Sequence, residues 1–275
     1  MIVVTGATGN IGKTLVRSLI EAGEKVTAVS RSVTAADVPE GVAHRRADLA
    51  RPAELTPALD GAEALFLLTS GEFVASGTDL GEVLEVVRRA GVRRVVMLSS
   101  QGVGTGRHPT AFEDIVTGGG LDWTILRPGG FASNATQWAA SIRTDRTVAA
   151  PFADVALPVI DPDDIAEVAA LALRADGHHG RTYVLTGPAP ISPRRQAEVL
   201  GDVLGEPVRF IELSRAEAAA RMGEFMPAPI VAATLDILGS PVPAEQRVSP
   251  DVEGLLGRPA RTFADWAARH ATSFR

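Results

Sequence analysis

Apolar and polar positions follow two different rhythms along the first 130 residues. Strand-like segments are predicted at Met1–Thr5, which is short and buried, and at Lys25–Ser30, Val42–Arg46, Ala64–Thr69, Arg94–Ser99 and Trp123–Arg127. Apolar residues at helical spacing predict helices between them, at Asn10–Ala22, Leu80–Ala90 and Ala111–Thr117. Continuous apolar strands that alternate with helices are typical of a parallel sheet covered on both faces. The pattern therefore predicts an α/β fold with a doubly wound parallel sheet.

The regular alternation of strands and helices becomes less clear after about residue 130, where helices dominate. Helices are predicted at Asp163–Leu173, Pro193–Leu204, Arg215–Met222 and Thr262–His270, and short strands at Ala156–Ile160, Thr182–Thr186 and Val208–Glu212. We expect a single domain over residues 1–275, with a core at 1–130 and a smaller C-terminal α+β lobe built mainly from 131–275. We expect this lobe to cover the carboxyl edge of the sheet, where ligands of open α/β sheets bind.

Composition narrows the class of protein. The net charge of −6 and the lack of a basic cluster argue against a nucleic-acid partner. The absence of cysteine excludes disulfides and thiolate metal sites, and the His178–His179 pair lacks further ligands at a plausible spacing, so no metal is expected. No apolar run reaches the roughly 18 residues that span a bilayer, and the N-terminus does not read as a signal peptide. A cytoplasmic protein is the expectation.

The strongest motif is VTGATGNIGK at Val4–Lys13, directly after a strand and at the start of a helix. Gly6 allows the tight turn, Gly9 lets a pyrophosphate approach the backbone, and Gly12 allows the helix to pack closely on the sheet. The helix N-terminus offers N–H groups and a positive dipole end to the phosphates. The motif predicts a Rossmann-type dinucleotide site formed by Gly6, Ala7, Thr8, Gly9, Asn10, Ile11 and Gly12.

The second and third strands bear on which nucleotide binds. An acidic residue after the second strand would favour NAD, but Ser30 and Arg31 stand there, and arginine offers a donor fork to a phosphate. NADP(H) is therefore favoured over NAD(H), although Arg31 could also be a solvated loop residue. Asp48, followed by Leu49, ends the third strand. Its carboxylate could accept from the adenine amino group, or it could cap the following helix.

Taken together, these segments resemble the NmrA-like family of atypical short-chain dehydrogenase/reductases over nearly the whole chain. The segments that carry the resemblance are TGATGNIG, VSR, RRVVMLSS, GGLDWTILRPGGFASN at Gly119–Asn134, DPDDIAEVAALAL at Asp161–Leu173, RTYVLTGP at Arg181–Pro188 and GRPARTFADWAARH at Gly257–His270. Family members include NAD(P)H-dependent quinone reductases and reductases that tailor aromatic polyketides. Other members bind the dinucleotide as redox sensors without catalysing a reaction.

The resemblance implies further cofactor contacts and places a segment beside the nicotinamide. The implied contacts beyond the glycine turn, Arg31 and Asp48 are Leu68, Thr69, Ser70, Ser99, Ser100 and Gln101, with Pro128, Gly129 and Phe131 beside the nicotinamide. Residues that we expect to face the substrate are Gln101, His108, Phe131, Asn134 and Trp138. Taken singly, Phe131, Trp138, Phe225 and Met226 are expected to be core residues, and together they suggest a pocket for a flat hydrophobic ligand.

The proton donor typical of short-chain dehydrogenases is missing. The only tyrosine is Tyr183, and the only lysines are Lys13 and Lys25, so a Tyr-x-x-x-Lys pair cannot form. His108 is a candidate general acid, or else a surface histidine. Ser99 and Ser100 could hydrogen-bond a substrate carbonyl or the nicotinamide ribose.

Two acids in the same region receive a structural interpretation. Glu113 and Asp114 are expected to be first-turn helix acids that favour the dipole.

These features favour an NADPH-dependent oxidoreductase without a Tyr/Lys relay. A quinone or polycyclic aromatic substrate spreads incoming negative charge over its ring, so it needs less help from an acid, and the cofactor supplies the reactive atom. The alternatives are a non-catalytic redox sensor that binds NAD(P) and a cofactor-dependent isomerase or epimerase. Self-association into a homo-oligomer is left open.

Overall fold

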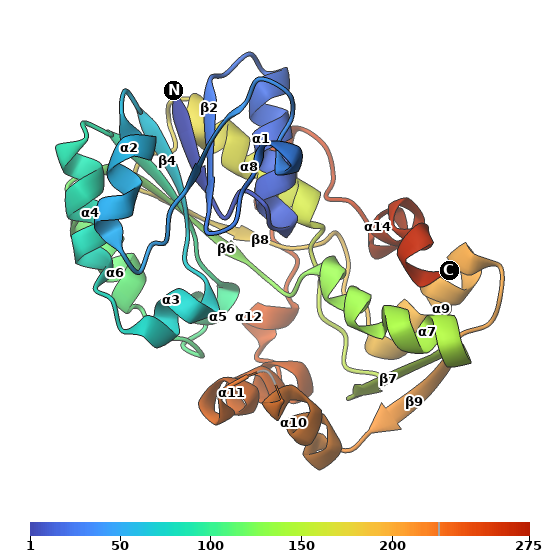
Figure 1. Ribbon diagram of the computed structural model, residues 1–275. Coiled ribbons are helices and arrows are strands. Elements are labelled where there is room, and N and C mark those ends of the chain that lie inside the picture. Colours follow the sequence, from blue (N-terminus) through green and yellow to red (C-terminus); the bar gives the residue numbers. More distant parts are fainter. Residues whose placement is uncertain (225) are drawn as a thin grey trace. The chain divides into compact units, whose positions relative to one another are not determined.

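The computed structural model describes residues 1–224 and 226–275 and contains a seven-stranded sheet (Figure 1). Its strand order is β3-β2-β1-β4-β5-β6-β8. The strands are β1 (Ile2–Thr5), β2 (Val26–Ser30), β3 (Ala43–Arg46), β4 (Ala64–Leu68), β5 (Arg94–Leu98), β6 (Asp122–Pro128) and β8 (Arg181–Leu185). The pairings from β3 through to β6 are parallel. The predicted doubly wound α/β fold is confirmed, and its strand order reverses between β1 and β4.

Helices cover both faces of this sheet. On one face α1 (Asn10–Glu21) lies beside α8 (Pro162–Arg174), and on the other are α2 (Thr56–Leu59), α4 (Leu80–Arg89) and α6 (Ala111–Gly118) (Figure 1). Strand side chains alternate between the faces, so Val3, Leu65 and Val95 pack into the cluster under α4 and α6. Shorter elements of the same region are η1 (Ala35–Asp37), η2 (Pro52–Leu55) and α3 (Gly71–Ser76).

Two compact units divide the described chain. Unit 1 comprises Met1–Ser100, Pro109–Arg127 and Pro162–Val184, and unit 2 comprises Gln101–His108, Pro128–Asp161 and Leu185–Arg275. The chain therefore passes between the units several times. The division into a core at 1–130 and a lobe at 131–275 stays a prediction.

Unit 2 has a hydrophobic core and a small sheet of its own. Its elements are α5 (Gln101–Gly104), η3 (Ala132–Trp138), α7 (Ala139–Asp145), β7 (Thr147–Pro151), α9 (Pro193–Leu204), β9 (Arg209–Leu213), α10 (Arg215–Gly223), α11 (Ala228–Gly239), α12 (Pro243–Gln246), α13 (Asp251–Leu256), α14 (Phe263–Arg269) and η4 (Ala271–Phe274). Strands β7 and β9 pair in parallel. The buried core includes Trp138, Ile142, Leu200, Trp266 and Phe274.

One predicted strand is wrong and one strand was not predicted. Ala156–Ile160 forms only two isolated bridges, Leu157 with Ile191 and Ile160 with Phe131. Pro158 lies inside this segment and has no N–H to donate to a ladder. The strand that pairs with β9 is instead β7, whose sequence TVAAP follows two β-branched residues with alanines and a proline, which are depleted in strands. Among the described residues, no helix is long and apolar enough to cross a membrane.

Candidate functional site

The glycine-rich turn links the end of β1 to the start of α1. Gly6 has φ of 64°, a left-handed conformation that favours glycine, and its carbonyl accepts from the N–H of Gly9 at 3.0 Å. A Cβ on Gly12 would lie 2.2 Å from the Gly6 carbonyl oxygen and 2.7 Å from the Ala7 Cα. The protein backbone itself therefore requires glycine at positions 6 and 12.

Gly9 differs from the other two glycines. Its backbone is extended, with φ of −85° and ψ of −177°, and a Cβ there would meet only the Gly6 oxygen, at 3.2 Å. Gly9 is the N-cap of α1 and has no side chain to accept from the helix N–H groups, and the first turn carries no acidic residue. The open backbone and the dipole of α1 fit a pyrophosphate, which supplies the negative charge that this end favours.

Ser30 and Arg31 lie where β2 ends. The Thr8 hydroxyl donates to Ser30 Oγ at 3.2 Å, which ties the glycine turn to β2. The Arg31 guanidinium pairs with Glu72 of α3, at 3.1 Å between Nη2 and Oε1, and both side chains are more than half exposed. The pKa of the Glu72 carboxyl is lowered by a hydrogen bond from its own backbone N–H and then by Arg31. A surface pair of this kind is weak, so Arg31 can exchange Glu72 for a phosphate.

The other residues of unit 1 that we expect to contact the cofactor take part in local hydrogen bonds and packing. Asp48 accepts from the N–H of Ala50 at 3.0 Å, and the N-cap of the next helix is Arg51, so Asp48 does not cap that helix. Leu49 packs against the core under α4. Leu68 lies next to Gly6, within 3.3 Å of a Cβ built there. Thr69 follows Leu68, and Ser70 is the N-cap of α3, accepting from the Phe73 N–H at 3.2 Å.

A buried ion pair lies beside Ser99 at the carboxyl ends of β5 and β6. The Ser99 hydroxyl donates to Glu113 Oε1 at 2.5 Å. Arg127 donates to both carboxylate oxygens of Glu113, from Nε at 3.0 Å and from Nη2 at 2.5 Å. Glu113 is only 5% exposed, and its hydrogen bonds are the main reason why the pKa of Arg127 is raised. Sequence reasoning treated Glu113 as a helix acid and missed this cluster. Ser100 follows Ser99 and is half-buried.

The Gln101–His108 segment belongs to unit 2 and is anchored there by a buried carboxylate. Glu245 of α12 is 2% exposed, and it accepts from the Thr105 hydroxyl at 2.9 Å and from Arg107 Nε at 3.2 Å. Gln101 Nε2 donates to the Ala244 carbonyl at 3.2 Å. His108 is half-buried, and its Nδ1 lies 2.6 Å from a Cβ built on Gly102, so glycine there makes room for the imidazole.

The other expected residues of unit 2 differ in burial. Pro128 is buried, and a Cβ on Gly129 would lie 3.3 Å from Gln101 Oε1, which brings these two candidates together. Phe131 is half-buried and Asn134 is exposed. Trp138 is buried within the aromatic core of unit 2, which favours its interpretation as a core residue. Met226 packs beside Leu213 and Leu235, and Phe225 lies outside the described residues.

Tyr183 has a partner of its own in unit 1. Its hydroxyl lies 2.9 Å from His178 Nδ1, and the two rings meet edge to face. Burial, and after it the charge of Arg94, lowers the pKa of His178. These groups lie on β8 and in the segment that precedes it, away from Ser99 in the strand order.

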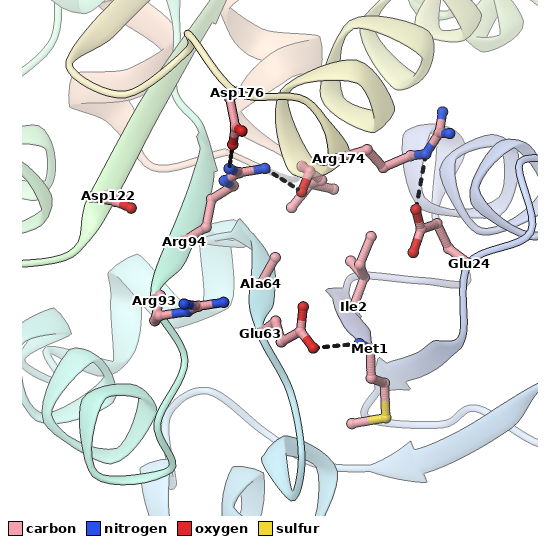
Figure 2. A pocket seen from close by; sticks show the side chains of 11 residues that line it. Met1, Ile2, Glu24, Glu63, Ala64, Arg93, Arg94, Asp122, Arg174 and Asp176 are labelled. Atoms are coloured by element: carbon pink, nitrogen blue, oxygen red, sulfur yellow. Dashed lines mark hydrogen bonds and ion pairs between the residues drawn. The ribbon is translucent and has the colours of Figure 1, made fainter.

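A pocket of about 390 Å³ lies at the opposite, amino-terminal edge of the sheet (Figure 2). Its polar walls are largely paired with one another: Arg94 with Asp176 at 2.7 Å, and Arg174 with Glu24 at 3.1 Å. It contains none of the expected cofactor residues and lies at the far end of β1 from the glycine turn. We therefore do not assign the cofactor or the substrate to it.

Comparison with known proteins identifies the family. Residues 6–176 match the NAD(P)H-binding family. The chain is 36% identical to (4-alkanoyl-5-oxo-2,5-dihydrofuran-3-yl)methyl phosphate reductase of Streptomyces griseus, covering 100% of this chain and 99% of that protein. It is 32% identical to NAD(P)H azoreductase of Xenophilus azovorans, over 100% of this chain and 99% of the relative.

A solved structure agrees with these relatives. The NADPH complex of the quinone oxidoreductase QOR2 from Escherichia coli superposes with a TM-score of 0.81 and 26% identity, over 98% of this chain and 99% of that one. The regulator NmrA has a TM-score of 0.75 at 20% identity, covers 97% of this chain and 94% of its own, and so shares the fold. The chain belongs to the NAD(P)H-binding family and is an NAD(P)H-dependent oxidoreductase of the NmrA-like, atypical short-chain dehydrogenase/reductase kind.

Proposed function

We propose that this protein is an NADPH-dependent reductase that transfers hydride to a conjugated, electron-poor acceptor of the quinone or polycyclic aromatic type. The observation that carries the proposal is that no tyrosine–lysine pair is available to supply the proton. The chain's single tyrosine, Tyr183, is bonded to His178, and no lysine follows Lys25. An acceptor that delocalises the incoming charge and takes its proton from water fits such a chain.

The relatives support the same class of acceptor. They are named for an alkanoyl-oxo-dihydrofuran, an azo compound and a quinone. Each of these names denotes an unsaturated compound, and none denotes a simple alcohol or an unconjugated ketone. A shared fold alone would not fix the substrate class. The proposal therefore rests on the missing donor first and on the relatives second.

The nicotinamide supplies the hydride, and the chain's own residues bind and orient the cofactor. The backbone at Gly6–Gly12 and the N-terminus of α1 hold the pyrophosphate. Arg31, released from Glu72, pairs with the 2′-phosphate and favours NADPH over NADH. Asp48 keeps one carboxylate oxygen for the adenine amino group, because the Ala50 N–H is bonded to the other. Gln101, His108 and Phe131 remain our candidates for contact with the acceptor.

Stopped-flow measurement of NADPH oxidation tests the proposal. A quinone and an azo dye should be reduced, and an unconjugated ketone should be reduced at least a hundredfold more slowly, since it needs a general acid. Comparable rates on all three acceptors would reveal a proton donor that the proposal denies. Tight binding of both redox forms without turnover of any acceptor would instead make the protein a dinucleotide sensor.

A further inference from the structure

The Ser99 hydroxyl has a defined hydrogen-bond direction. Its Oγ donates to Glu113 Oε1 at 2.5 Å, and its backbone N–H donates to the Leu126 carbonyl at 2.7 Å. Ser99 comes directly after β5, at the carboxyl edge of the parallel sheet, where ligands of such sheets bind. The orientation of this hydroxyl therefore bears on what it can do for a ligand.

The buried carboxylate of Glu113 holds the Ser99 hydroxyl in this direction. The carboxylate is almost fully buried in the first turn of α6 and is approached by three donors, two from Arg127 and one from Ser99. Buried charges need such partners. Turning the hydroxyl away would remove a charge-assisted hydrogen bond from a buried carboxylate, and water could not replace it there.

A serine hydroxyl has one proton to donate and two lone pairs that accept. Because its O–H donates to Glu113, Ser99 presents only lone pairs to a ligand. A substrate carbonyl is also an acceptor, so the two oxygens do not attract each other. A hydroxyl of the nicotinamide ribose and the carboxamide NH₂ group both carry donors.

We propose that Ser99 accepts a hydrogen bond from the nicotinamide nucleoside of NADPH, and that Glu113, itself held by Arg127, is the positioning residue that sets this direction. Ser99 then neither binds the substrate carbonyl nor gives it a proton. This inference rests on the proposed function, from which it takes the cofactor. It decides between the two partners that the sequence left open for Ser99.

Two substitutions at Ser99 form the first arm of the test. Ser99→Ala removes the acceptor and leaves the Glu113–Arg127 pair in place. It should weaken NADPH binding, measured as Kd by fluorescence titration, by about three- to tenfold, as for one hydrogen bond. The hydride-transfer rate at saturating NADPH should fall by less than roughly tenfold, which is below the loss expected for a general acid. Ser99→Thr retains the hydroxyl and should retain the parent Kd.

The second arm tests Glu113 against its neighbour. Glu113→Gln places an NH₂ group where one oxygen now accepts, so it opposes either Arg127 or Ser99. We expect it to weaken NADPH binding at least as much as Ser99→Ala. The matched control is Asp114→Asn in the same turn, since Asp114 is exposed and accepts from Thr110. It should leave the Kd for NADPH unchanged.

The outcomes separate this inference from the proposed function. A Ser99→Ala protein with the parent Kd and a hydride-transfer rate about a hundredfold lower would make Ser99 a proton donor and overturn the inference. A parent protein that binds NADPH but reduces no acceptor would contradict the proposed function, and the Kd comparison would still decide the role of Ser99. If Glu113→Gln does not fold, the two Ser99 variants decide alone.

Discussion

The same added methyl group should have different effects at two positions of the glycine turn. In Gly12→Ala the new Cβ would lie 2.2 Å from the Gly6 oxygen and 2.7 Å from the Ala7 Cα, so backbone must move. In Gly9→Ala the Cβ would meet the Gly6 oxygen alone, at 3.2 Å, on backbone that any residue adopts. We expect the first variant to lose stability and the second to lose the cofactor.

The size of the first effect follows from what α1 can do. The helix packs on α8, β1 and β2, so it cannot shift away from the turn without disturbing a buried face. Overpacking of this kind costs about 1–3 kcal/mol or more, and alanine returns up to about 1 kcal/mol of helix propensity. A net loss of about 2 kcal/mol lowers the unfolding midpoint by about 4–8 °C in a chain of this size.

Gly9→Ala should change the free energy of unfolding by no more than about 1 kcal/mol, the range for an altered N-cap. Its methyl group stands where the pyrophosphate should approach, so the Kd for NADPH should rise roughly tenfold or more. Thermal unfolding and NADPH titration of both purified variants measure the two effects. The reasoning is refuted if the two proteins melt alike, or if folded Gly9→Ala protein binds NADPH as the parent does.

Three further predictions follow from single contacts. Arg31→Ala should weaken NADPH binding by about 1–3 kcal/mol more than NADH binding, and Glu72→Gln should strengthen NADPH binding because it removes the competing carboxylate; equal changes for both cofactors in titrations would contradict the phosphate contact. His108→Ala and Tyr183→Phe should each slow quinone reduction in stopped flow by less than roughly tenfold, and a thousandfold loss in the His108 variant would identify a general acid. The pKa of His178 is lowered, so the unfolded chain binds its proton more readily. Its contribution to stability is present above about pH 6.5 and is lost as the pH falls through the lower, folded-state pKa. The thermal midpoint should fall over that window, and His178→Gln should flatten the fall.

Local signals predicted most of the sheet, because the central strands β1, β4 and β5 each carry their own apolar run, whereas the edge strand β3 is polar and largely exposed. Ile2–Thr5 is buried on both faces, so its apolar run is continuous, and the turn that follows needs Gly6 for its positive φ. Strand β7 had no such signal. Its stability depends on β9, about 60 residues further along the chain, and such long-range pairing is invisible in a short window.

Glu113 shows how a local rule can hide a long-range partner. An acid in the first turn of a helix is favoured by the dipole wherever the helix lies, so this rule cannot tell a solvated acid from a buried one. The informative residue is Arg127, which lies next to the end of β6, the strand that follows α6. A cation at the end of a buried strand needs an anion within reach, and the preceding helix supplies one. Arg127 is therefore the sequence signal that indicates the Glu113–Arg127 pair.

The Glu113–Arg127 pair also changes what the missing tyrosine means. Because the Ser99 hydroxyl donates its hydrogen bond to Glu113, this oxygen is left as an acceptor and does not replace the tyrosine as a proton donor. We propose that, unless His108 donates it, the proton of the reduced acceptor comes from water, which favours substrates that are stable as anions for long enough to be protonated. An engineered donor, such as Ala111→Lys on the helix that carries Glu113, should therefore extend reduction to unconjugated ketones, measurable as NADPH oxidation above the parent's background. No gain in a folded variant that binds NADPH would show that the absence of a donor is not what limits the substrate range.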